Sequence, residues 1–302
     1  MKVSIILPTL NAELYISVLV SRLRNQTLPP HEIIVVDSNS EDNTVGEAQK
    51  LGATILSVER NDFDHGGTRN FAASHAKGDI LVFMTQDALP ESDTFIEELI
   101  APFSDPKVAA AYGRQIARPE ATPIEQMTRE FNYPDDSKLK TIADVDKYGI
   151  KTFFFSDVCS AIRKDVFVEV GGFPEPIISN EDMIYAAKCI LKGYSIAYAS
   201  EAAVLHSHQY KLSQEFRRNF DIGVSLKMND WIFQYARPEG EGLRLIKAQL
   251  RYLCRPKLWI WLPRWFAESV AKFLGYRMGL SYRRIPRKIV RKFSMHRMFW
   301  RV

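Results

Sequence analysis

The feature of the sequence that most limits its fold is a regular alternation of short apolar runs with longer segments of helical spacing. The apolar runs are rich in β-branched residues and lack clean alternation, which is typical of strands covered on both faces. The order βαβαβαβ therefore predicts an α/β fold with a mostly parallel, doubly wound sheet. The predicted strands are residues 3–7, 33–36, 54–58 and 80–84, and the predicted helices between them are residues 14–23, 44–51 and 68–76.

Polar side chains follow these predicted strands at the points where they end. The carboxyl ends of parallel strands meet at one edge of a sheet, and ligands bind beyond that edge. A ligand site is therefore expected there. The polar residues at the predicted edge include Thr9, Asn11, Asp37, Ser38, Gln86 and Asp87.

Asp87 is the first charged residue after the apolar run at 80–84. One carboxylate is enough to hold a hard cation such as Mg²⁺, because water and phosphate oxygens complete its shell. Two structural interpretations compete with this one: Asp87 caps a helix that begins near Glu91, or it closes a turn before Pro90. The chain has no Walker A, GxSxG or HExxH sequence and no GxGxxG after the first strand, so a nucleotide would need another phosphate seat.

The loop NDFDHGGTRN could form that seat. Its adjacent glycines let the backbone approach a ligand closely. Arg69 and Asn70 follow at the expected start of a helix, and a helix N-terminus beside a guanidinium favours a diphosphate. Gly67, Arg69 and Asn70 are therefore candidate ligand contacts. A tight turn with an exposed arginine, and a loop histidine (His65) without a role, is the alternative.

A pair of acids, Glu181 and Asp182, opens a predicted helix at 181–191. Ser or Asn before acids in the first turn is ordinary helix-start sequence, favoured by the helix dipole. The same position would keep an aspartate ionised at neutral pH, as a general base must be. Because one acid suffices for a cap, the second favours a catalytic role.

His206 and His208 follow an apolar, strand-like segment and lie two residues apart. If the strand continues, both side chains point to one side, where they could bind a metal or contact phosphate. A buried structural histidine is the alternative for either one.

Between a predicted strand at 108–116 and this second part of the chain lies a long connection, residues 117–140. Connections of this length are uncommon unless they serve a function. Residues 117–140 are a candidate lid or acceptor loop, with a surface insertion as the alternative.

Charge is segregated along the chain: residues 243–302 carry 16 of its 40 lysines and arginines but one of its 36 acids, Glu268. Such asymmetry indicates an anionic partner. The apolar stretches there are interrupted by charges, so none supplies the roughly 20 apolar residues of a spanning helix. The many aromatic residues favour basic helices lying on an anionic membrane surface, and no nucleic-acid contact is expected. A helical cap packed on the rest of the chain is the alternative.

Three scattered cysteines exclude a disulfide framework and indicate reduced thiols in the cytosol.

The N-terminal apolar run is interrupted by Pro8 and Asn11 and lacks a small-residue cleavage site, so it is predicted to be a strand and not a signal peptide. The expected location is cytoplasmic, peripheral on the inner face of the cytoplasmic membrane. No pattern in the sequence indicates an oligomeric state.

Over residues 1–235 the chain resembles the family 2 glycosyltransferases with a GT-A fold. The segments that carry the resemblance are VSIILPTLN, EIIVVDSNSEDNT, GGTRNFAASHAKGDILVFMTQDALP and GGFPEPIISNEDMIYAAKCILKGYSIAY. More narrowly, FDHGGTRN, TQDA and HSHQY followed by FRRNFDIG are similar to bacterial rhamnosyltransferases that use dTDP-L-rhamnose to build surface polysaccharides.

The resemblance implies roles for individual residues. Asp87 matches the second acid of an Asp-X-Asp motif that binds Mg²⁺ or Mn²⁺ on the donor diphosphate, while Thr85 replaces the first. Ser38 replaces the acid that commonly contacts uracil, which fits a donor other than a UDP-sugar. Asp182 matches the catalytic base, and His206 is the better match to a metal-side histidine, with His208 as the alternative.

The predicted function is that of an inverting glycosyltransferase that moves L-rhamnose from dTDP-L-rhamnose to a lipid-linked saccharide acceptor. Residues 1–235 would form the GT-A catalytic domain, and residues 236–302 a basic amphipathic helical region associated with an anionic membrane surface. The alternatives are another nucleotide-sugar donor, a sugar nucleotidyltransferase on a similar sheet, or a non-catalytic membrane-surface module. The nucleotidyltransferase is disfavoured because TLNAELYIS lacks a Gly-rich, basic loop.

Overall fold

The computed structural model describes residues 1–236 and 239–300. Within them, one nine-stranded sheet has the order β3-β2-β1-β4-β8-β6-β9-β5, with β7 paired to β9. Strands β3, β2, β1 and β4 run parallel, whereas β8 is antiparallel to both of its neighbours, β4 and β6. The strands are β1 (Val3–Thr9), β2 (Glu32–Asp37), β3 (Thr54–Ser57), β4 (Ile80–Met84), β5 (Leu89–Pro90), β6 (Val108–Ile116), β7 (Lys138–Lys140), β8 (Cys159–Arg163) and β9 (Ser195–Leu205).

Helices cover both faces of the sheet, which explains why the parallel strands are apolar on both sides. Ile5 and Leu7 in β1 join a core cluster with α1 and α4, while Ile6 joins a cluster on the other face with α3 and α8. The doubly wound fold predicted from the sequence is confirmed. The α-helices are α1 (Glu13–Arg24), α2 (Thr44–Lys50), α3 (His65–His75), α4 (Phe95–Ile100), α5 (Pro123–Asn132), α6 (Val145–Tyr148), α7 (Lys164–Val170), α8 (Glu181–Leu191), α9 (Leu212–Met228), α10 (Glu239–Leu253), α11 (Leu262–Leu280) and α12 (Arg287–Phe293).

Helix α3 begins earlier than predicted, and its first glycine packs against a neighbouring loop. The Asp64 side chain accepts a hydrogen bond from the Gly67 N–H at 2.7 Å and so caps the helix before both glycines. A Cβ on Gly66 would lie 2.0 Å from the Pro174 carbonyl oxygen. Gly66 therefore allows α3 to pack on the loop before α8. The ligand contact expected at Gly67 stays a prediction.

Two further local predictions change. The helix expected near Glu91 begins at Phe95, so Asp87 does not cap it. The long connection at 117–140 folds in part into α5, which begins with Pro123 and is capped by the Thr122 hydroxyl. Pro at the first helical position and Thr before it are common helix-start signals.

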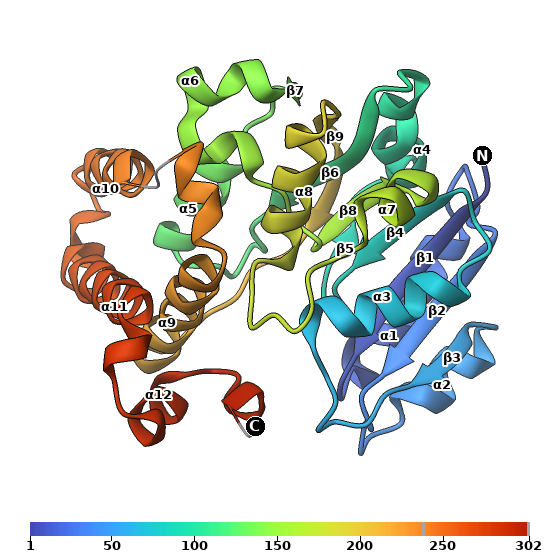
Figure 1. Cartoon of the computed structure of the whole chain (residues 1–302), viewed down its shortest axis with the longest axis horizontal. Helices are drawn as coiled ribbons and strands as arrows, with labels where there is room; N and C mark the ends of the chain where they lie inside the picture. Colours follow the sequence, from blue (N-terminus) through green and yellow to red (C-terminus); the bar gives the residue numbers. More distant parts are fainter. Residues whose placement is uncertain (237–238, 301–302) are drawn as a thin grey trace.

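Helix α11 packs closely against α9 (Figure 1). A Cβ on Gly223, Gly275 or Gly279 would lie 2.1–2.4 Å from a backbone oxygen of the facing helix. Only glycine permits this separation, so any side chain at these three positions would push the helices apart. The first part of the basic region is thus anchored to the rest of the chain, on the opposite side of the molecule from β2 and β3 in Figure 1.

The outer surfaces of α10 and α11 carry exposed apolar side chains. Their spacing places them on one stripe of each helix. None of the described helices is long and apolar enough to cross a membrane. The predicted domain boundary after residue 235 adjoins residues 237–238, which lie outside the described residues, as do residues 301–302. The exposed apolar residues are Leu243, Ile246 and Leu250 in α10, and Phe266, Val270, Phe273 and Leu274 in α11.

Candidate functional site

The ends of β1, β2 and β4 meet at one edge of the sheet, as the sequence predicted. Thr9 pairs with Asp37 in the β1–β2 register, and its hydroxyl donates to the Asp37 carboxylate at 3.2 Å. The Gln86 amide accepts from the Leu10 N–H at 2.8 Å and donates to the Leu10 carbonyl at 3.2 Å. These bonds hold the three strand ends together without a ligand.

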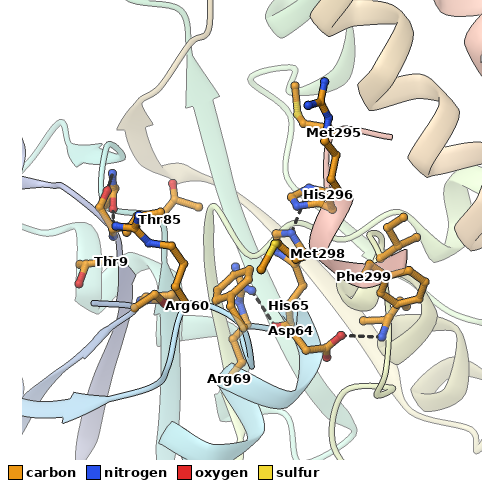
Figure 2. Close-up of a pocket in the computed structure, with 18 residues that line it drawn as sticks. Thr9, Arg60, Asp64, His65, Arg69, Thr85, Met295, His296, Met298 and Phe299 are labelled. Carbon is orange, nitrogen blue, oxygen red and sulfur yellow. Dashed lines mark hydrogen bonds between the residues drawn. The ribbon is translucent and has the colours of Figure 1, made fainter. Parts of the chain in front are cut away.

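A cavity of about 510 Å³, here called the larger cavity, opens beside this edge (Figure 2). It runs from the ends of β1 and β2, across the start of α3, to the segment that follows α12. Four residues predicted to contact a nucleotide line it: Thr9, Ser38, Arg69 and Gln86.

The other four predicted contacts do not line the larger cavity. Asn11 accepts a hydrogen bond from the Glu41 N–H at 2.9 Å and so holds the loop before α2. Asn70 donates to the Phe173 carbonyl at 2.9 Å. Asp37 and Gly67 are bonded to their own strand-end and helix-cap partners. In this structure these four shape the edge of the sheet and the start of α3.

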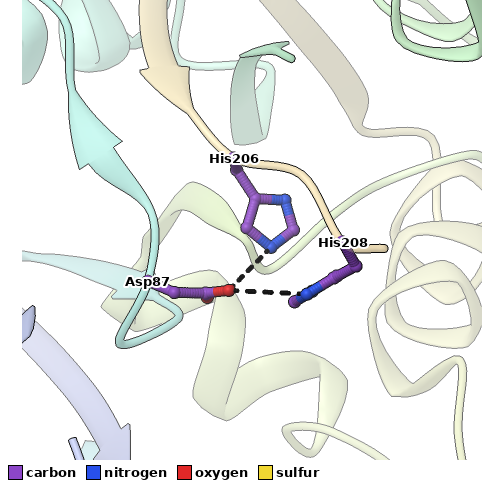
Figure 3. A group of neighbouring side chains, drawn as sticks. All are labelled: Asp87, His206 and His208. Atoms are coloured by element: carbon purple, nitrogen blue, oxygen red, sulfur yellow. Dashed lines mark ion pairs between the residues drawn. The ribbon is translucent and has the colours of Figure 1, made fainter. Parts of the chain in front are cut away.

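Asp87, His206 and His208 converge on one point (Figure 3). The Asp87 carboxylate lies 3.5 Å from His206 Nε2 and 3.7 Å from His208 Nδ1. One ligand atom from each residue lies within 4.8 Å of the other two. Strand β9 ends at Leu205, so His206 and His208 lie beyond it and the alternation of side chains along a strand does not set their directions. Both rings nevertheless face the Asp87 carboxylate. The sequence left the two histidines as alternatives, and the structure brings them together.

Gln115, in β6, fixes how His206 is protonated. Its amide nitrogen donates to the Tyr133 hydroxyl at 2.7 Å and to Ser156 Oγ at 2.9 Å. Its amide oxygen accepts from Arg129 and lies 3.0 Å from His206 Nδ1. Because that oxygen can only accept, Nδ1 carries the proton and Nε2 presents a lone pair.

The group fits a cation, since it places acceptors against one another. His206 Nε2 is buried and has no hydrogen-bond partner among the described residues. Burial, with the positive charges of Arg129, Arg118 and Arg218, lowers the pKa of His206 well below its usual value. A neutral imidazole nitrogen facing a carboxylate oxygen is a donor set for a divalent ion. An orphaned buried acceptor is costly, and a bound cation would satisfy it.

A second cluster of acids surrounds Arg69 at the start of α8. Arg69 Nη1 lies 3.1 Å from Glu181 Oε1, and Arg69 Nε lies 3.6 Å from Asp157 Oδ2. Asp182 accepts from the Met183 N–H at 2.7 Å and from the Asp157 N–H at 3.3 Å. Three carboxyl groups therefore lie together, and two of them contact the one guanidinium.

This crowding changes the protonation expected for Asp182. Burial, and then the charges of Glu181 and Asp157, raise the pKa of Asp182 well above its usual value. Burial also raises the pKa of Asp157 to about 7, although Arg69 opposes the shift. The helix start was expected to favour ionised Asp182, whereas desolvation and like charges oppose ionisation and outweigh its two backbone hydrogen bonds. A carboxylate with a raised pKa is a stronger proton acceptor once ionised.

A second cavity of about 360 Å³ lies on the far side of the β4 end, between α5, α9 and α11. Its wall includes His206 and His208, together with Arg129, Arg218 and Lys272. Thr85 lines both cavities, and its hydroxyl is buried without a partner among the described residues. The two cavities thus meet at the end of β4, beside the Asp87 group.

The sequence did not single out Gln115, Asp157 or the segment at 295–299. Gln115 is a polar residue near the end of an apolar strand, a signal that the strand-end rule could have used. Asp157 precedes β8, where its neighbours depend on the antiparallel insertion of β8 between β4 and β6. No sequence pattern marks residues 295–299.

Comparison with known proteins gives consistent relatives. The profile of glycosyl transferase family 2 matches residues 4–171. The O-antigen chain rhamnosyltransferase RfbN of Salmonella typhimurium is 41% identical over 303 residues, 99% of this chain and 96% of that protein. The O-antigen chain rhamnosyltransferase WbaN of Salmonella anatum is 41% identical over 92% of this chain and 88% of its own length.

Solved structures with lower identity share the fold. The mannosyltransferase PcManGT of Pyrobaculum calidifontis, in complex with GDP-Man and Mn²⁺, has a TM-score of 0.59 and 17% identity over 99% of this chain and 84% of that one. Residues 1–349 of TarS from S. aureus give a TM-score of 0.59 and 20% identity over 99% of this chain and 85% of that one. At these identities the likeness concerns the fold alone.

Proposed function

The chain belongs to glycosyl transferase family 2 and has the GT-A fold expected from its sequence, and from this we propose that it transfers L-rhamnose from dTDP-L-rhamnose to a lipid-linked saccharide in O-antigen synthesis. Two relatives named as O-antigen chain rhamnosyltransferases, each 41% identical over most of both chains, support the sugar and the pathway.

The observation that carries the proposal is the meeting of two cavities at the end of β4. A transferase must hold a donor and an acceptor side by side, with the acceptor hydroxyl aimed at the anomeric carbon. Thr85 lines both cavities, Arg69 of the acid cluster lines the larger cavity, and His206 and His208 of the metal group line the second. The larger cavity is the donor site, and the second cavity is the acceptor site.

The donor site begins at the strand ends that the sequence identified. Thr9 and Ser38 lie at its nucleoside end, and Ser38 Oγ is buried without a partner among the described residues. A buried hydroxyl without a partner gains a hydrogen bond when a carbonyl or imide group of the nucleotide base contacts it. Arg60 also lines the donor site and adds positive charge for a diphosphate.

Asp87, His206 and His208 would hold Mg²⁺ or Mn²⁺. When bound, such an ion neutralises charge on the donor diphosphate and on the departing dTDP. Gln115 keeps the His206 Nε2 lone pair available for it. Thr85 offers a neutral oxygen where the family commonly has the first acid of its Asp-X-Asp motif, so the site carries one negative charge fewer.

Asp182 is the catalytic base. Its carboxylate takes the proton of the acceptor hydroxyl while that oxygen attacks the anomeric carbon and the bond to dTDP breaks. The reaction is one displacement with inversion and no covalent intermediate. The raised pKa of Asp182 favours this proton transfer once the carboxylate is ionised.

The acceptor site faces the helices that carry exposed apolar residues. Gln249 in α10 donates to the Thr128 hydroxyl of α5 at 2.8 Å and accepts from the Trp265 ring of α11 at 2.9 Å, so these helices are tied to the acceptor cavity. Exposed apolar stripes beside many lysine and arginine side chains suit the inner surface of an anionic cytoplasmic membrane. There, a lipid-linked acceptor would reach the cavity without leaving the bilayer.

Calorimetric titration tests the donor. The wild-type chain and Asp87→Asn are titrated with dTDP, UDP and GDP, each with Mg²⁺, with Mn²⁺ and with a chelator. Preferential, metal-dependent dTDP binding that Asp87→Asn loses supports the proposal. Tighter UDP or GDP binding keeps the enzyme class and refutes the rhamnose donor, and undiminished binding with the chelator refutes the metal role.

Sedimentation with liposomes tests the membrane surface. We expect the double variant Phe266→Glu/Phe273→Glu to lose binding to anionic vesicles and to keep dTDP binding, because both residues point outward from α11. The matched control is Val168→Glu/Leu14→Glu, at residues that are exposed on α7 and α1. Equal sedimentation of wild type and the α11 variant would contradict membrane docking by this face.

A further inference from the structure

We infer that residues 295–299, here called the 295–299 segment, form one wall of the donor site, and that His296 acts through His65 as a positioning residue for Glu181. This inference rests on the proposed function, because it takes the larger cavity as the donor site. It gives the end of the basic region a role inside the catalytic domain in addition to membrane contact.

The 295–299 segment lines the larger cavity along its whole length. Met295, His296, Arg297, Met298 and Phe299 all contribute to the wall. Opposite them lie the strand-end residues and the start of α3 (Figure 2). A donor bound between the two sides would touch an element more than 200 residues away in sequence from the strand ends.

Two independent anchors hold the 295–299 segment in place. The buried Asp221 carboxylate in α9 accepts from the Met295 N–H at 2.8 Å and from the His296 N–H at 3.2 Å. Phe299 packs in an apolar cluster with Phe220 of α9 and with Ile178, which precedes the acids of α8. The anchors join the segment to α9, against which α11 packs, and to the loop that precedes α8.

His296 and His65 form a direct contact inside the cavity wall. Their Nε2 atoms lie 3.3 Å apart, and the rings meet edge to face at 4.6 Å between centroids. Burial lowers the pKa of His65 to about 3 and that of His296 to about 4, so both rings are neutral near pH 7. One Nε2–H therefore donates to the other Nε2.

The direction of that hydrogen bond follows from the other side of His65. His65 Nδ1 lies 3.8 Å from Glu181 Oε1, and a carboxylate there favours a proton on Nδ1. His65 Nε2 is then the acceptor, and His296 Nε2–H is the donor. Glu181 adjoins Asp182 and also pairs with Arg69, so the position of His65 affects the charge beside the base.

The wall itself is tested with Met298→Glu in the full chain. A carboxylate at this position would face the donor diphosphate, so dTDP affinity should fall at least about tenfold through like-charge repulsion. The matched control is Met228→Glu, at a residue that is 40% exposed on α9 and lines neither cavity. Equal dTDP affinity of wild type and Met298→Glu would overturn the wall.

The positioning role is tested with His296→Gln and His296→Phe. A glutamine amide nitrogen can donate to His65, whereas phenylalanine keeps a ring and removes the donor. We expect His296→Phe to lower kcat about two- to tenfold, the effect of one hydrogen bond, and His296→Gln to restore most of it. A structural role alone would show equal kcat for both variants, or a loss that follows the melting temperature.

The outcomes separate this inference from the proposed function. If wild type binds UDP or GDP in place of dTDP, the rhamnose donor is refuted, and the wall is measured with the nucleotide that binds. If wild type binds dTDP and Met298→Glu binds it equally, the wall is refuted and the donor stands. If wild type binds no nucleotide, both are refuted.

Discussion

The two charged clusters at the site balance their charge in opposite ways. Asp87 faces the neutral imidazoles of His206 and His208, and among the described residues it forms no ion pair with a lysine or arginine. The acid cluster at the start of α8 contains its own cation, since Arg69 contacts both Glu181 and Asp157. The first cluster could balance its charge with a bound cation, whereas the second already contains one.

Burial has opposite consequences for the two clusters. At His206 it lowers the pKa and leaves a neutral nitrogen that can bind a metal. At Asp182 it raises the pKa and makes a better proton acceptor. Desolvation disfavours the charged form in both cases, so one physical effect favours the proposed metal ligand in one cluster and the proposed base in the other.

The largest expected effect comes from removing the base. Asp182→Asn should lower the transfer rate by about 10²–10⁴-fold, the usual contribution of a general base. Nucleotide affinity should stay at the wild-type value, because Asp182 is absent from the lining of the larger cavity. Initial rates and calorimetry measure the two quantities, with the exposed Asp136→Asn as the control. Wild-type turnover in Asp182→Asn would refute the assignment of Asp182 as the catalytic base.

The second largest effect is on the free energy of unfolding, measured with a chelator present, and it distinguishes the two clusters. Arg69→Met removes the built-in cation, and breaking a buried ion pair in this way costs about 3–5 kcal/mol of unfolding free energy. Asp87→Asn should cost much less, because it leaves no opposite charge unpaired. Urea unfolding of both variants and of Arg24→Met, at an exposed position on α1, makes the comparison. Equal losses at Asp87 and Arg69 would contradict the difference drawn between the clusters.

A smaller effect should appear when the support of His206 is removed. Gln115→Met takes away the acceptor that holds the proton on Nδ1, and losing such a supporting partner typically costs about 10–100-fold in metal affinity. Mn²⁺ affinity, measured by calorimetry, should fall while dTDP affinity without metal stays unchanged. Gln49→Met, exposed on α2, is the control. Unchanged Mn²⁺ affinity would show that the tautomer does not matter for this site.

The parts of the site that the sequence predicted are those at strand ends. Thr9, Asp37 and Gln86 could be placed together because parallel strands end at one edge, and this edge is set by the local apolar pattern. Asp87, His206 and His208 needed the family resemblance as well, since β9 pairs with β6 and β5, far from β4 along the sheet order.

The parts that the sequence missed depend on contacts between distant elements. Asp157 reaches Arg69 because β8 inserts antiparallel between β4 and β6. The 295–299 segment reaches the larger cavity because three glycines bring α11 against α9 and Asp221 holds the chain that follows α12. Strand order and helix crossing are decided by packing in three dimensions, which chain order alone does not specify.

The smallest expected effect is a shift in the pH profile, and it tests whether the acids of the second cluster share charge. Asp157 has a pKa of about 7, so it adds negative charge near Asp182 as the pH rises past that value. Asp157→Asn removes this charge and stabilises ionised Asp182, which lowers the Asp182 pKa. Activity needs ionised Asp182, so the acid limb of kcat should move to lower pH. The exposed Asp146→Asn should leave the limb in place. A limb that stays in place in Asp157→Asn, or moves to higher pH, would contradict the contribution of the Asp157 charge to the Asp182 pKa.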